Sequence, residues 1–289
     1  LNAGPYTTHT PTIVAAASRK FQYRIPNYLF NGYTVATNGP TAGAFRGYGN
    51  SQLTFGRELM MSRIARKLHL DPVDFRLRNH VKTGEKFPAA ASAVTSCGIE
   101  KCARRCQEIR REIDEKEGIA DNEDIRQAWG VSFACHGSGP SSKEGMSSAV
   151  ILVSDDGGIR LITGSADIGQ GSETMLSQIA AECLGIPLSH VKITAADTGI
   201  TPYDTGTFGS SQTYVSGNAV VLACQDVILK LTDALSDCYD SADITFGEDK
   251  KFHIPSEYLC VTLEGAAHQV VFGIKGAVII GNSSYKAKE

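Results

Sequence analysis

A glycine-rich segment at residues 43–49, which reads GAFRGYG, holds Arg46 between two aromatic residues. Glycines allow the backbone to turn through positive φ and to approach a ligand closely. A guanidinium offers planar, forked donors that suit an anionic or heteroatom-rich partner. The segment therefore predicts a binding site. Taken alone it is equally compatible with a surface turn whose arginine is solvated.

Two more polar, glycine-containing loops precede predicted helices, at Gly164 to Ser172 and at Thr205 to Thr213. The start of a helix leaves backbone N–H groups unpaired and carries partial positive charge, so phosphate or polar ligand groups bind there. Together with Gly43 to Asn50, these loops predict helix starts that converge on one ligand. Independent capping of each helix remains the alternative.

Known nucleotide-binding motifs do not fit these loops. Gly164 and Gly169 have the spacing of a phosphate-binding loop, but Gln170-Gly171-Ser172 stands where a lysine and a hydroxyl residue are required. The dinucleotide-binding pattern lacks its third glycine, because Thr174 occupies that position. A neutral glutamine between glycines favours a ligand that is recognised by hydrogen bonds more than by charge.

Nucleophilic catalysis finds little support in the sequence. The chain has no Gly-x-Ser-x-Gly motif, and its 7 histidines are scattered. His136 is the histidine in a glycine-rich loop, where a hydrogen-bonded or solvated role is favoured over a catalytic one. For Asp167, Asp197 and Asp204, roles in turns and at strand ends are favoured.

Composition bounds the class of protein. The 289 residues are 42% hydrophobic and 20% charged, which is typical of a well-packed soluble protein. A net charge of -3 with scattered basic residues argues against a nucleic-acid partner. Without a long apolar run or a signal pattern, the sequence predicts no membrane association and a cytoplasmic location. The 8 cysteines favour reduced thiols. A start at Leu1 is expected of a processed subunit, a proteolytic piece or a fragment.

The first part of the chain predicts three helices. One begins at Asn50 with Leu53, Met60, Ile64 and Leu68 on one face, and a second runs from Pro72 to about Asn79 behind an Asp71 cap. Cys102 and Cys106 share the apolar face of the third, where packing is favoured over metal binding. The charged residues that follow predict a linker near 115–126, which divides the chain into lobes at 1–118 and 126–289.

The second part predicts a β-rich unit. Strands at 149–153 and 159–163 flank Asp155-Asp156-Gly157-Gly158, a hairpin signal. A helix ending at Gly185 and a strand at 191–195 then predict a βαβ crossover. A helix with a stripe from Val220 to Leu235 follows. The tail, roughly Lys251 to Ile280, alternates and ends in a strand-like run at Ala277 to Ile280. The fold class predicted is α+β, with mixed sheets and packed helices in two lobes.

Motifs in a fixed order along the chain resemble the molybdenum-binding part of the molybdenum hydroxylases, of which xanthine dehydrogenase is the best-known member. They are Ile25-Pro26-Asn27, residues 43–49, Ile168 to Gly171, Gly206 to Ser210 and Gly217 to Val220. The resemblance implies a molybdopterin-binding domain with two lobes, whose cofactor is molybdopterin or its dinucleotide form. It also implies hydroxylation of an N-heterocycle or an aldehyde by oxygen from water. Electrons would pass to iron-sulfur clusters and FAD on partner chains.

The resemblance also assigns residues. Cofactor binding falls to Arg46, Gly169, Gln170, Gly171, Thr207, Ser210 and Thr213. Substrate binding falls to Phe45, Tyr48, Phe208 and Gly209. It implies no direct metal ligand in this chain.

The chain also departs from the family pattern. Val14 stands where xanthine dehydrogenase has a purine-binding arginine, and Gly139 where it has a second substrate-stacking aromatic, so xanthine is disfavoured as substrate. The Gly-Glu motif of the general base is not matched after Val220, and no cysteine spacing fits iron-sulfur ligation. The base is therefore expected outside this chain, on another molybdenum-binding segment or subunit. A non-catalytic subunit or interaction module that retains the fold is the alternative.

Overall fold

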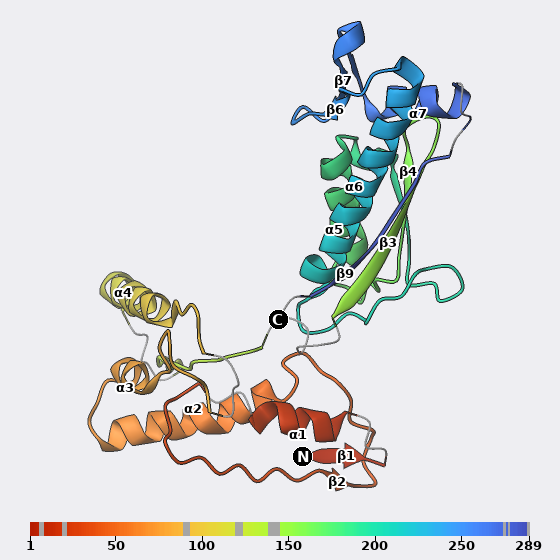
Figure 1. Ribbon diagram of the computed structural model, residues 1–289. Helices are drawn as coiled ribbons and strands as arrows, with labels where there is room; N and C mark the ends of the chain where they lie inside the picture. The colour runs from red at the N-terminus through yellow and green to blue at the C-terminus, as the bar shows by residue number, and fades with distance from the viewer. Residues whose placement is uncertain are drawn as a thin grey trace. The chain divides into compact units, whose positions relative to one another are not determined.

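The protein is described by a computed structural model that covers residues 1–5, 9–18, 22–88, 93–118, 124–137, 145–273, 276 and 278–287. It divides into two compact units, Leu1–Gly137 and Ser138–Glu289 (Figure 1). The division falls after the charged segment that the sequence indicates as a linker. The assignment of the lobes to 1–118 and 126–289 stays a prediction.

The first unit is mainly helical. Its elements are β1 (Asn2–Gly4), α1 (Thr10–Ser18), β2 (Val35–Ala36), α2 (Asn50–Lys67), α3 (Pro72–Asn79) and α4 (Ile99–Glu117), and β1 pairs in parallel with β2. The predicted start of α3 is confirmed. The Asp71 carboxylate accepts hydrogen bonds from the backbone N–H of Val73 at 2.8 Å and of Asp74 at 3.0 Å, and Pro72 follows the cap.

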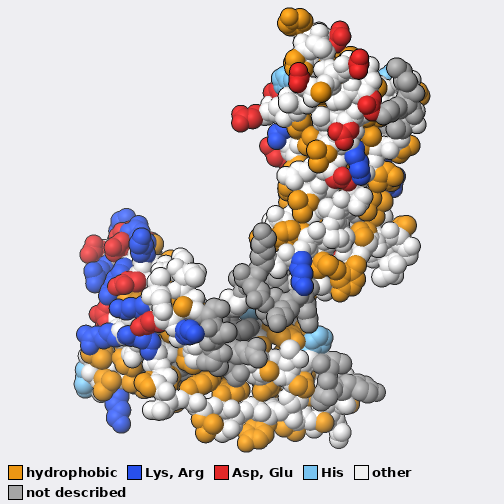
Figure 2. All heavy atoms as spheres, viewed as in Figure 1, with side chains coloured by type: hydrophobic (Ala, Val, Ile, Leu, Met, Phe, Trp, Pro, Cys, Tyr) orange, Lys and Arg blue, Asp and Glu red, His pale blue; other side chains and the backbone are white. Residues whose placement is uncertain are grey.

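Helix α2 confirms the predicted helix but buries a different face. Met60 and Leu68, predicted on the packed face, are 55% and 54% exposed, whereas Arg57 and Glu58 are buried. The predicted face was wrong because apolar periodicity does not show that Arg57 and Glu58 can be buried when partners from elsewhere in the chain bond to them. Hydrophobic side chains consequently appear on the surface of this unit (Figure 2).

The Glu58 carboxylate is the centre of the first unit. It accepts hydrogen bonds from the Tyr23 hydroxyl at 2.9 Å, Arg57 Nε at 3.0 Å, Arg76 Nε at 2.7 Å and the Phe133 backbone N–H at 3.0 Å. Burial by itself raises the pKa of Glu58, but the Phe133 N–H and the two guanidinium groups outweigh it and hold the pKa below its usual value. The anion thus joins α2, α3 and two loop segments.

Helix α4 lies at the surface and corrects the sequence interpretation of its cysteines. Cys102 and Cys106 are exposed, and Ala103 is the buried residue of the helix. Arg105 pairs instead with Glu108 at 3.0 Å and with Glu112 at 3.2 Å. Charges of both signs therefore crowd the helix (Figure 2).

The second unit combines two sheets with three helices in its described residues. Along the chain run β3 (Met146–Val153), β4 (Ile159–Thr163), α5 (Ser172–Leu184), η1 (Leu188–His190), β5 (Val191–Ala195), α6 (Gln212–Tyr239), β6 (Thr245–Phe246), β7 (Phe252–Ile254), η2 (Pro255–Glu257), β8 (Leu259–Val261), α7 (Leu263–Phe272) and β9 (Ile280–Lys286). The larger sheet has the order β5-β4-β3-β9, and the smaller one has the order β6-β7-β8.

The larger sheet confirms the predicted hairpin and crossover. Strands β3 and β4 are antiparallel with Gly157 of their turn at φ 72°, and β4 is parallel to β5 across α5. Helices α5 and α6 pack beside this sheet, and α6 buries the predicted stripe from Val220 to Leu235 (Figure 1). The α+β class with mixed sheets and packed helices is confirmed.

The tail follows its predicted strand pattern only in part, because β7 and β8 are strands but a helix comes after them. Helix α7 occupies Leu263–Phe272, where Thr262 caps the helix start by accepting a hydrogen bond from the Gly265 N–H at 3.3 Å. Leu263, Ala266 and Val270 of this helix are buried in the core. Helical burial therefore accounts for apolar positions that the sequence analysis assigned to strands, and β9 begins only at Ile280.

Among the described helices, none combines the length and the apolar character that crossing a membrane requires.

Replacing Glu58 should destabilise the first unit. Glu58→Gln leaves Arg57 and Arg76 buried without a counter-charge, so we expect the free energy of unfolding to fall by about 3–5 kcal/mol. Urea denaturation, monitored through the fluorescence of Trp129, measures this free energy of unfolding. Trp129 is the single tryptophan of the chain. The exposed Glu112→Gln should cost under about 1 kcal/mol.

The same variant has a pH signature. Because folding lowers the pKa of Glu58 below 4.5, its stabilisation is present above that pH and is lost as the pH falls through the folded-state pKa. The stability difference between wild type and Glu58→Gln should therefore shrink on acidification. An equal difference at all pH values contradicts the assignment of the anion as the stabilising form.

Candidate functional site

Two of the predicted ligand loops lie side by side in the second unit. The GQG loop, residues 164–172, leads from β4 into α5, and the hydroxyl-rich loop, residues 205–213, leads into α6. The Thr207 hydroxyl donates to the Ala166 carbonyl at 2.6 Å, and the Gln212 amide donates to the Ser165 hydroxyl. The structure thus brings together two segments that are far apart in the sequence.

Asp204 holds this pair of loops on the sheet and helix behind it. Its carboxylate accepts hydrogen bonds from the Ser147 hydroxyl of β3 at 2.6 Å, the Ser216 hydroxyl of α6 at 3.1 Å and the Gly206 backbone N–H at 2.7 Å. Gly164 packs against the same segment, since a Cβ there would lie 2.4 Å from the Pro202 carbonyl oxygen. From the sequence, Asp204 is expected only in a turn or at a strand end, because its partners Ser147 and Ser216 are distant along the chain.

The GQG loop presents open backbone. Gly169 and Gly171 have φ of 100° and 79°, and a Cβ at either position would meet no described atom within 4 Å. The Asp167 carboxylate accepts from the Gly169 N–H at 2.7 Å and from the Gly171 N–H at 3.3 Å, and these bonds lower the pKa of Asp167. This confirms the turn role predicted for Asp167. The carboxylate also occupies N–H groups that the sequence analysis reserved for a ligand.

The Gln170 side chain folds back onto its own loop. Its Oε1 accepts from the Ile168 N–H at 2.7 Å, and its Nε2 donates to the Ala166 carbonyl at 3.1 Å. The residue is exposed, so a ligand can reach the amide from solvent. Contact with a ligand would exchange these loop bonds for bonds to the ligand.

The start of α5 keeps one unused polar group. Gly171 and Ser211 are the cap residues of α5 and α6 and make no side-chain cap bond, but the Asp167 carboxylate accepts from the Gly171 N–H at the α5 start. The Ser172 hydroxyl, on a residue that is 1% exposed, has no hydrogen-bond partner. An unpaired buried hydroxyl costs free energy, so it suits a polar ligand group at the α5 start. In the sequence, Ser172 stands out only as the last residue of the loop.

The predicted residues of the hydroxyl-rich loop differ in what they contact. Thr207 is half-buried and bonds the GQG loop, whereas Ser210 and Thr213 are exposed. Gly209 and Ser210 turn the chain through φ of 61° and 56°. Phe208 is 44% exposed, and its carbonyl accepts from the Ser211 hydroxyl at 2.7 Å. Ser210, Thr213 and the Phe208 ring are therefore accessible to a ligand.

Arg46 and its neighbours belong to the first unit. Gly47, Tyr48 and Gly49 all have positive φ, of 96°, 41° and 86°, and a Cβ at Gly49 would lie 2.5 Å from the Ile13 carbonyl oxygen. This sharp turn leaves Arg46 exposed and leads into α2, whose start has no side-chain cap. The Tyr48 hydroxyl lies 3.2 Å from His9 Nδ1.

Phe45 of the same turn is 83% exposed. Convergence of this turn with the two loops of the second unit stays a prediction. Gly139, the position of the second substrate-stacking aromatic, lies outside the described residues.

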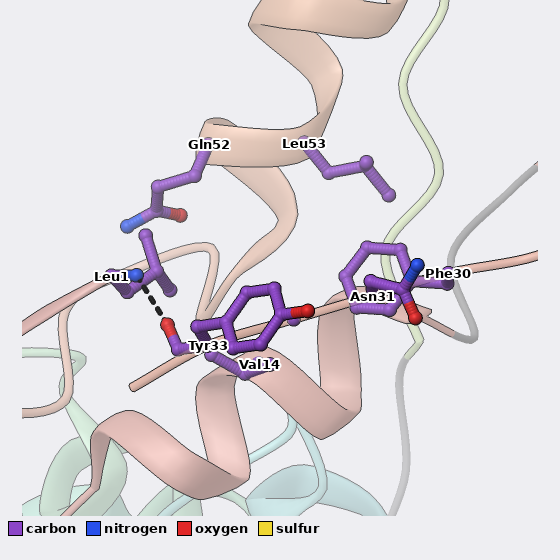
Figure 3. Close-up of a pocket in the computed structure, with 8 residues that line it drawn as sticks. Leu1, Val14, Phe30, Asn31, Tyr33, Gln52 and Leu53 are labelled. Carbon is purple, nitrogen blue, oxygen red and sulfur yellow. Dashed lines mark hydrogen bonds between the residues drawn. The ribbon is translucent and has the colours of Figure 1, made fainter. Parts of the chain in front are cut away.

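A cavity of about 330 Å³ lies in the first unit (Figure 3). It is lined by Leu1, Val14, Phe30, Asn31, Gly32, Tyr33, Gln52 and Leu53. None of these eight residues has a charged side chain, and the polar side-chain groups come from Asn31, Gln52 and Tyr33. Val14, which the resemblance places where xanthine dehydrogenase has a purine-binding arginine, therefore lies among uncharged polar and apolar side chains.

Comparison with known families shows to which protein family the chain with these loops belongs. Two family models, both described as a molybdopterin cofactor-binding domain, match the chain over residues 1–80 and 114–289. The chain belongs to the molybdopterin cofactor-binding domain family. The second model matches more than half of the chain and spans both loops of the second unit, and the first includes the Arg46 turn.

Individual relatives of this molybdopterin-binding domain include a xanthine dehydrogenase subunit and an aldehyde oxidoreductase. It is 35% identical over 226 residues to a xanthine dehydrogenase molybdenum-binding subunit of Escherichia coli, matching 76% of this chain and 30% of that one. It is 31% identical over 251 residues to an aldehyde oxidoreductase of Megalodesulfovibrio gigas, matching 85% of this chain and 27% of that one. The chain thus spans less than a third of either relative.

A solved structure shares the fold. The aldehyde oxidoreductase of Desulfovibrio desulfuricans aligns with a TM-score of 0.70 at 24% identity, covering 99% of this chain and 29% of that one.

Removing the Asp204 carboxylate should loosen both loops. In Asp204→Ala the buried Ser147 hydroxyl loses its acceptor, so we expect the free energy of unfolding to fall by about 1–3 kcal/mol. We also expect faster amide exchange at Gly206. Asp197→Ala is the matched control, because Asp197 is exposed and its carboxylate bonds the N–H of Gly199 within its own turn. Equal effects of the two substitutions on stability and exchange would contradict the role of Asp204 in holding the loops.

Proposed function

We propose that this chain holds the molybdopterin cofactor of a molybdenum hydroxylase and forms part of its substrate pocket. The enzyme hydroxylates an N-heterocycle or an aldehyde with oxygen from water. The observation that carries the proposal is the open Gly169–Gly171 backbone beside the unpartnered Ser172 hydroxyl, at the start of α5. Membership in the cofactor-binding family supports it.

The residues present fit such a cofactor. Molybdopterin combines a phosphate with a heteroatom-rich pterin, and hydroxyl and amide groups at a helix start suit both. Ser172, Ser210 and Thr213 supply hydroxyl groups, and Gln170 supplies an amide able to donate and accept. Arg46 supplies a forked cation. Thr207 acts differently, because its hydroxyl fixes the hydroxyl-rich loop against Ala166.

The division of labour follows from these contacts. When bound, the cofactor supplies the metal that transfers oxygen and takes up two electrons. The chain's own residues bind and orient: Asp167 shapes the GQG turn and Asp204 fixes the hydroxyl-rich loop. Phe45 in the first unit and Phe208 in the second offer exposed aromatic faces to a flat substrate, and the resemblance adds Tyr48 and Gly209 as substrate contacts. The uncharged side chains around Val14 supply no guanidinium for a purine, which disfavours xanthine as the substrate.

The remaining parts of the reaction are assigned outside this chain. A glutamate general base belongs to another molybdenum-binding segment or subunit, and iron-sulfur and FAD subunits receive the electrons. The proportion of the relatives' length that the chain spans supports this division, since 30% of the molybdenum-binding subunit is matched. Isolated, the chain is expected to show little turnover, because a general base contributes about 10²–10⁴-fold to rate.

Arg46→Ala in the assembled enzyme should lower the content of bound pterin, because it removes a forked donor from the cofactor. Release of the pterin by denaturation and its quantification by fluorescence, with molybdenum measured in parallel, gives the readout. Arg46→Lys should retain an intermediate amount, and Arg63→Ala on the exposed side of α2 should retain all of it. Full pterin content in Arg46→Ala would refute the assignment.

Tyr48→Ala should raise KM for the substrate while molybdenum and pterin stay bound, because the aromatic face contacts substrate rather than cofactor. Tyr48→Phe is the matched control: it keeps the ring and removes only the hydroxyl near His9. Steady-state kinetics together with metal analysis separates a substrate role of Tyr48 from a cofactor role. Loss of metal with unchanged KM contradicts the substrate role.

A further inference from the structure

The smaller sheet of the second unit places a cysteine opposite a histidine. Strands β7 and β8 are antiparallel, and His253 is directly paired with Cys260. Phe252 and Ile254 on either side of His253 are buried in the core, so the alternation of a strand turns His253 to the opposite face. Cys260 shares that outer face and is exposed. The pairing register therefore brings thiol and imidazole together at the surface.

The imidazole of His253 connects the thiol to a carboxylate. Cys260 Sγ lies 3.2 Å from His253 Nδ1, and His253 Nε2 lies 2.8 Å from Asp249 Oδ1. With Nε2–H donating to the carboxylate, Nδ1 is left to accept the proton of the thiol. A nucleophile, a base and a group that orients the base are thus arranged in sequence.

The turn before β7 is shaped for this arrangement. Gly247 leaves the necessary space, because a Cβ there would lie 2.6 Å from His253 Nε2 and 2.7 Å from Asp249 Oδ1. The Gly247 N–H donates to the Lys251 carbonyl at 2.9 Å and so closes the turn that carries Asp249. The hydrogen bond from His253 lowers the pKa of Asp249, which keeps the carboxylate ionised as an acceptor.

Other exposed cysteines in the described residues provide a comparison. Cys97, Cys102 and Cys106 are also exposed. The sulfur of Cys97 lies 4.0 Å from His80 Nδ1, which is longer than the 3.2 Å at Cys260. Cys260 is therefore set apart by a closer imidazole that is itself bonded to a carboxylate.

We propose that Cys260 is a nucleophilic thiol and a site of modification by small disulfides, with His253 as its base and Asp249 as the positioning residue. The Cys260 sulfur attacks one sulfur of the disulfide while its proton passes to His253 Nδ1. A new S–S bond forms as the old one breaks, and the leaving thiolate takes the proton. Cys260 is oxidised and one half of the disulfide is reduced to a thiol. This site uses none of the residues assigned to the cofactor.

The test treats the intact enzyme with oxidised glutathione and maps mixed disulfides by peptide mass spectrometry. Cys260 should react at least about tenfold faster than Cys97, Cys102 or Cys106 in the same molecule. The His253→Gln variant should react at Cys260 about 10²-fold more slowly, the lower end of what a base contributes. Rates at the other three cysteines should not change, which separates loss of the base from loss of folding.

Variants of Asp249 test the positioning role on an exposed turn. Asp249→Asn keeps an oxygen that accepts from His253 Nε2–H, so the rate should stay close to wild type, whereas Asp249→Ala should lower it several-fold. Cys260→Ser should abolish labelling of that peptide. A Cys260 rate no higher than that of Cys102, or an unchanged rate in His253→Gln, overturns the proposal. Neither result bears on cofactor binding, which pterin content measures separately.

Discussion

The first unit depends on one buried anion. The Glu58 carboxylate gathers a phenol, two guanidinium groups and a backbone N–H, and its donors come from α2, α3 and the segments around Tyr23 and Phe133. A buried charge of this kind is tolerated only when its hydrogen-bonding capacity is met, so the four segments must meet at one point. That requirement turns the charged side of α2 inward and leaves Met60 and Leu68 at the surface. The Arg46 turn leads directly into this anchored helix.

Carboxylates perform a related task in the second unit, at the surface and on a smaller scale. Asp204 ties the hydroxyl-rich loop to β3 and α6, and Asp167 folds the GQG turn around its own carboxylate. Each also accepts a hydrogen bond from a glycine N–H of its own loop and so holds that glycine at positive φ, which other residues disfavour. The loops are thereby shaped before any ligand arrives, and preorganisation of this kind reduces the ordering cost of binding.

The open backbone at Gly169 and Gly171 and the unpartnered hydroxyl of Ser172 connect this scaffold to the family to which the chain belongs. A domain that binds a large polar cofactor needs donors that its own fold has not consumed. Asp167 and Thr207 illustrate the opposite case, since their bonding groups already serve the loops. Residues of the two loops thus separate into those that remain available to the cofactor and those that position them.

Sequence by itself determined the local features. The α3 cap at Asp71, the Gly157 hairpin turn, the crossover through α5 and the loops ahead of α2, α5 and α6 all follow from residue types within a few positions, because caps and turns are local. The order of motifs also indicated the family correctly.

Tertiary structure alone decided which groups meet. The buried face of α2 and the serine hydroxyls that bond to Asp204 depend on partners from other segments. The pairing of Cys260 with His253 depends on strand register. Apolar periodicity missed the buried face of α2 and the helix α7, because it records where hydrophobic residues recur and not whether distant partners satisfy a buried charge or cover a surface.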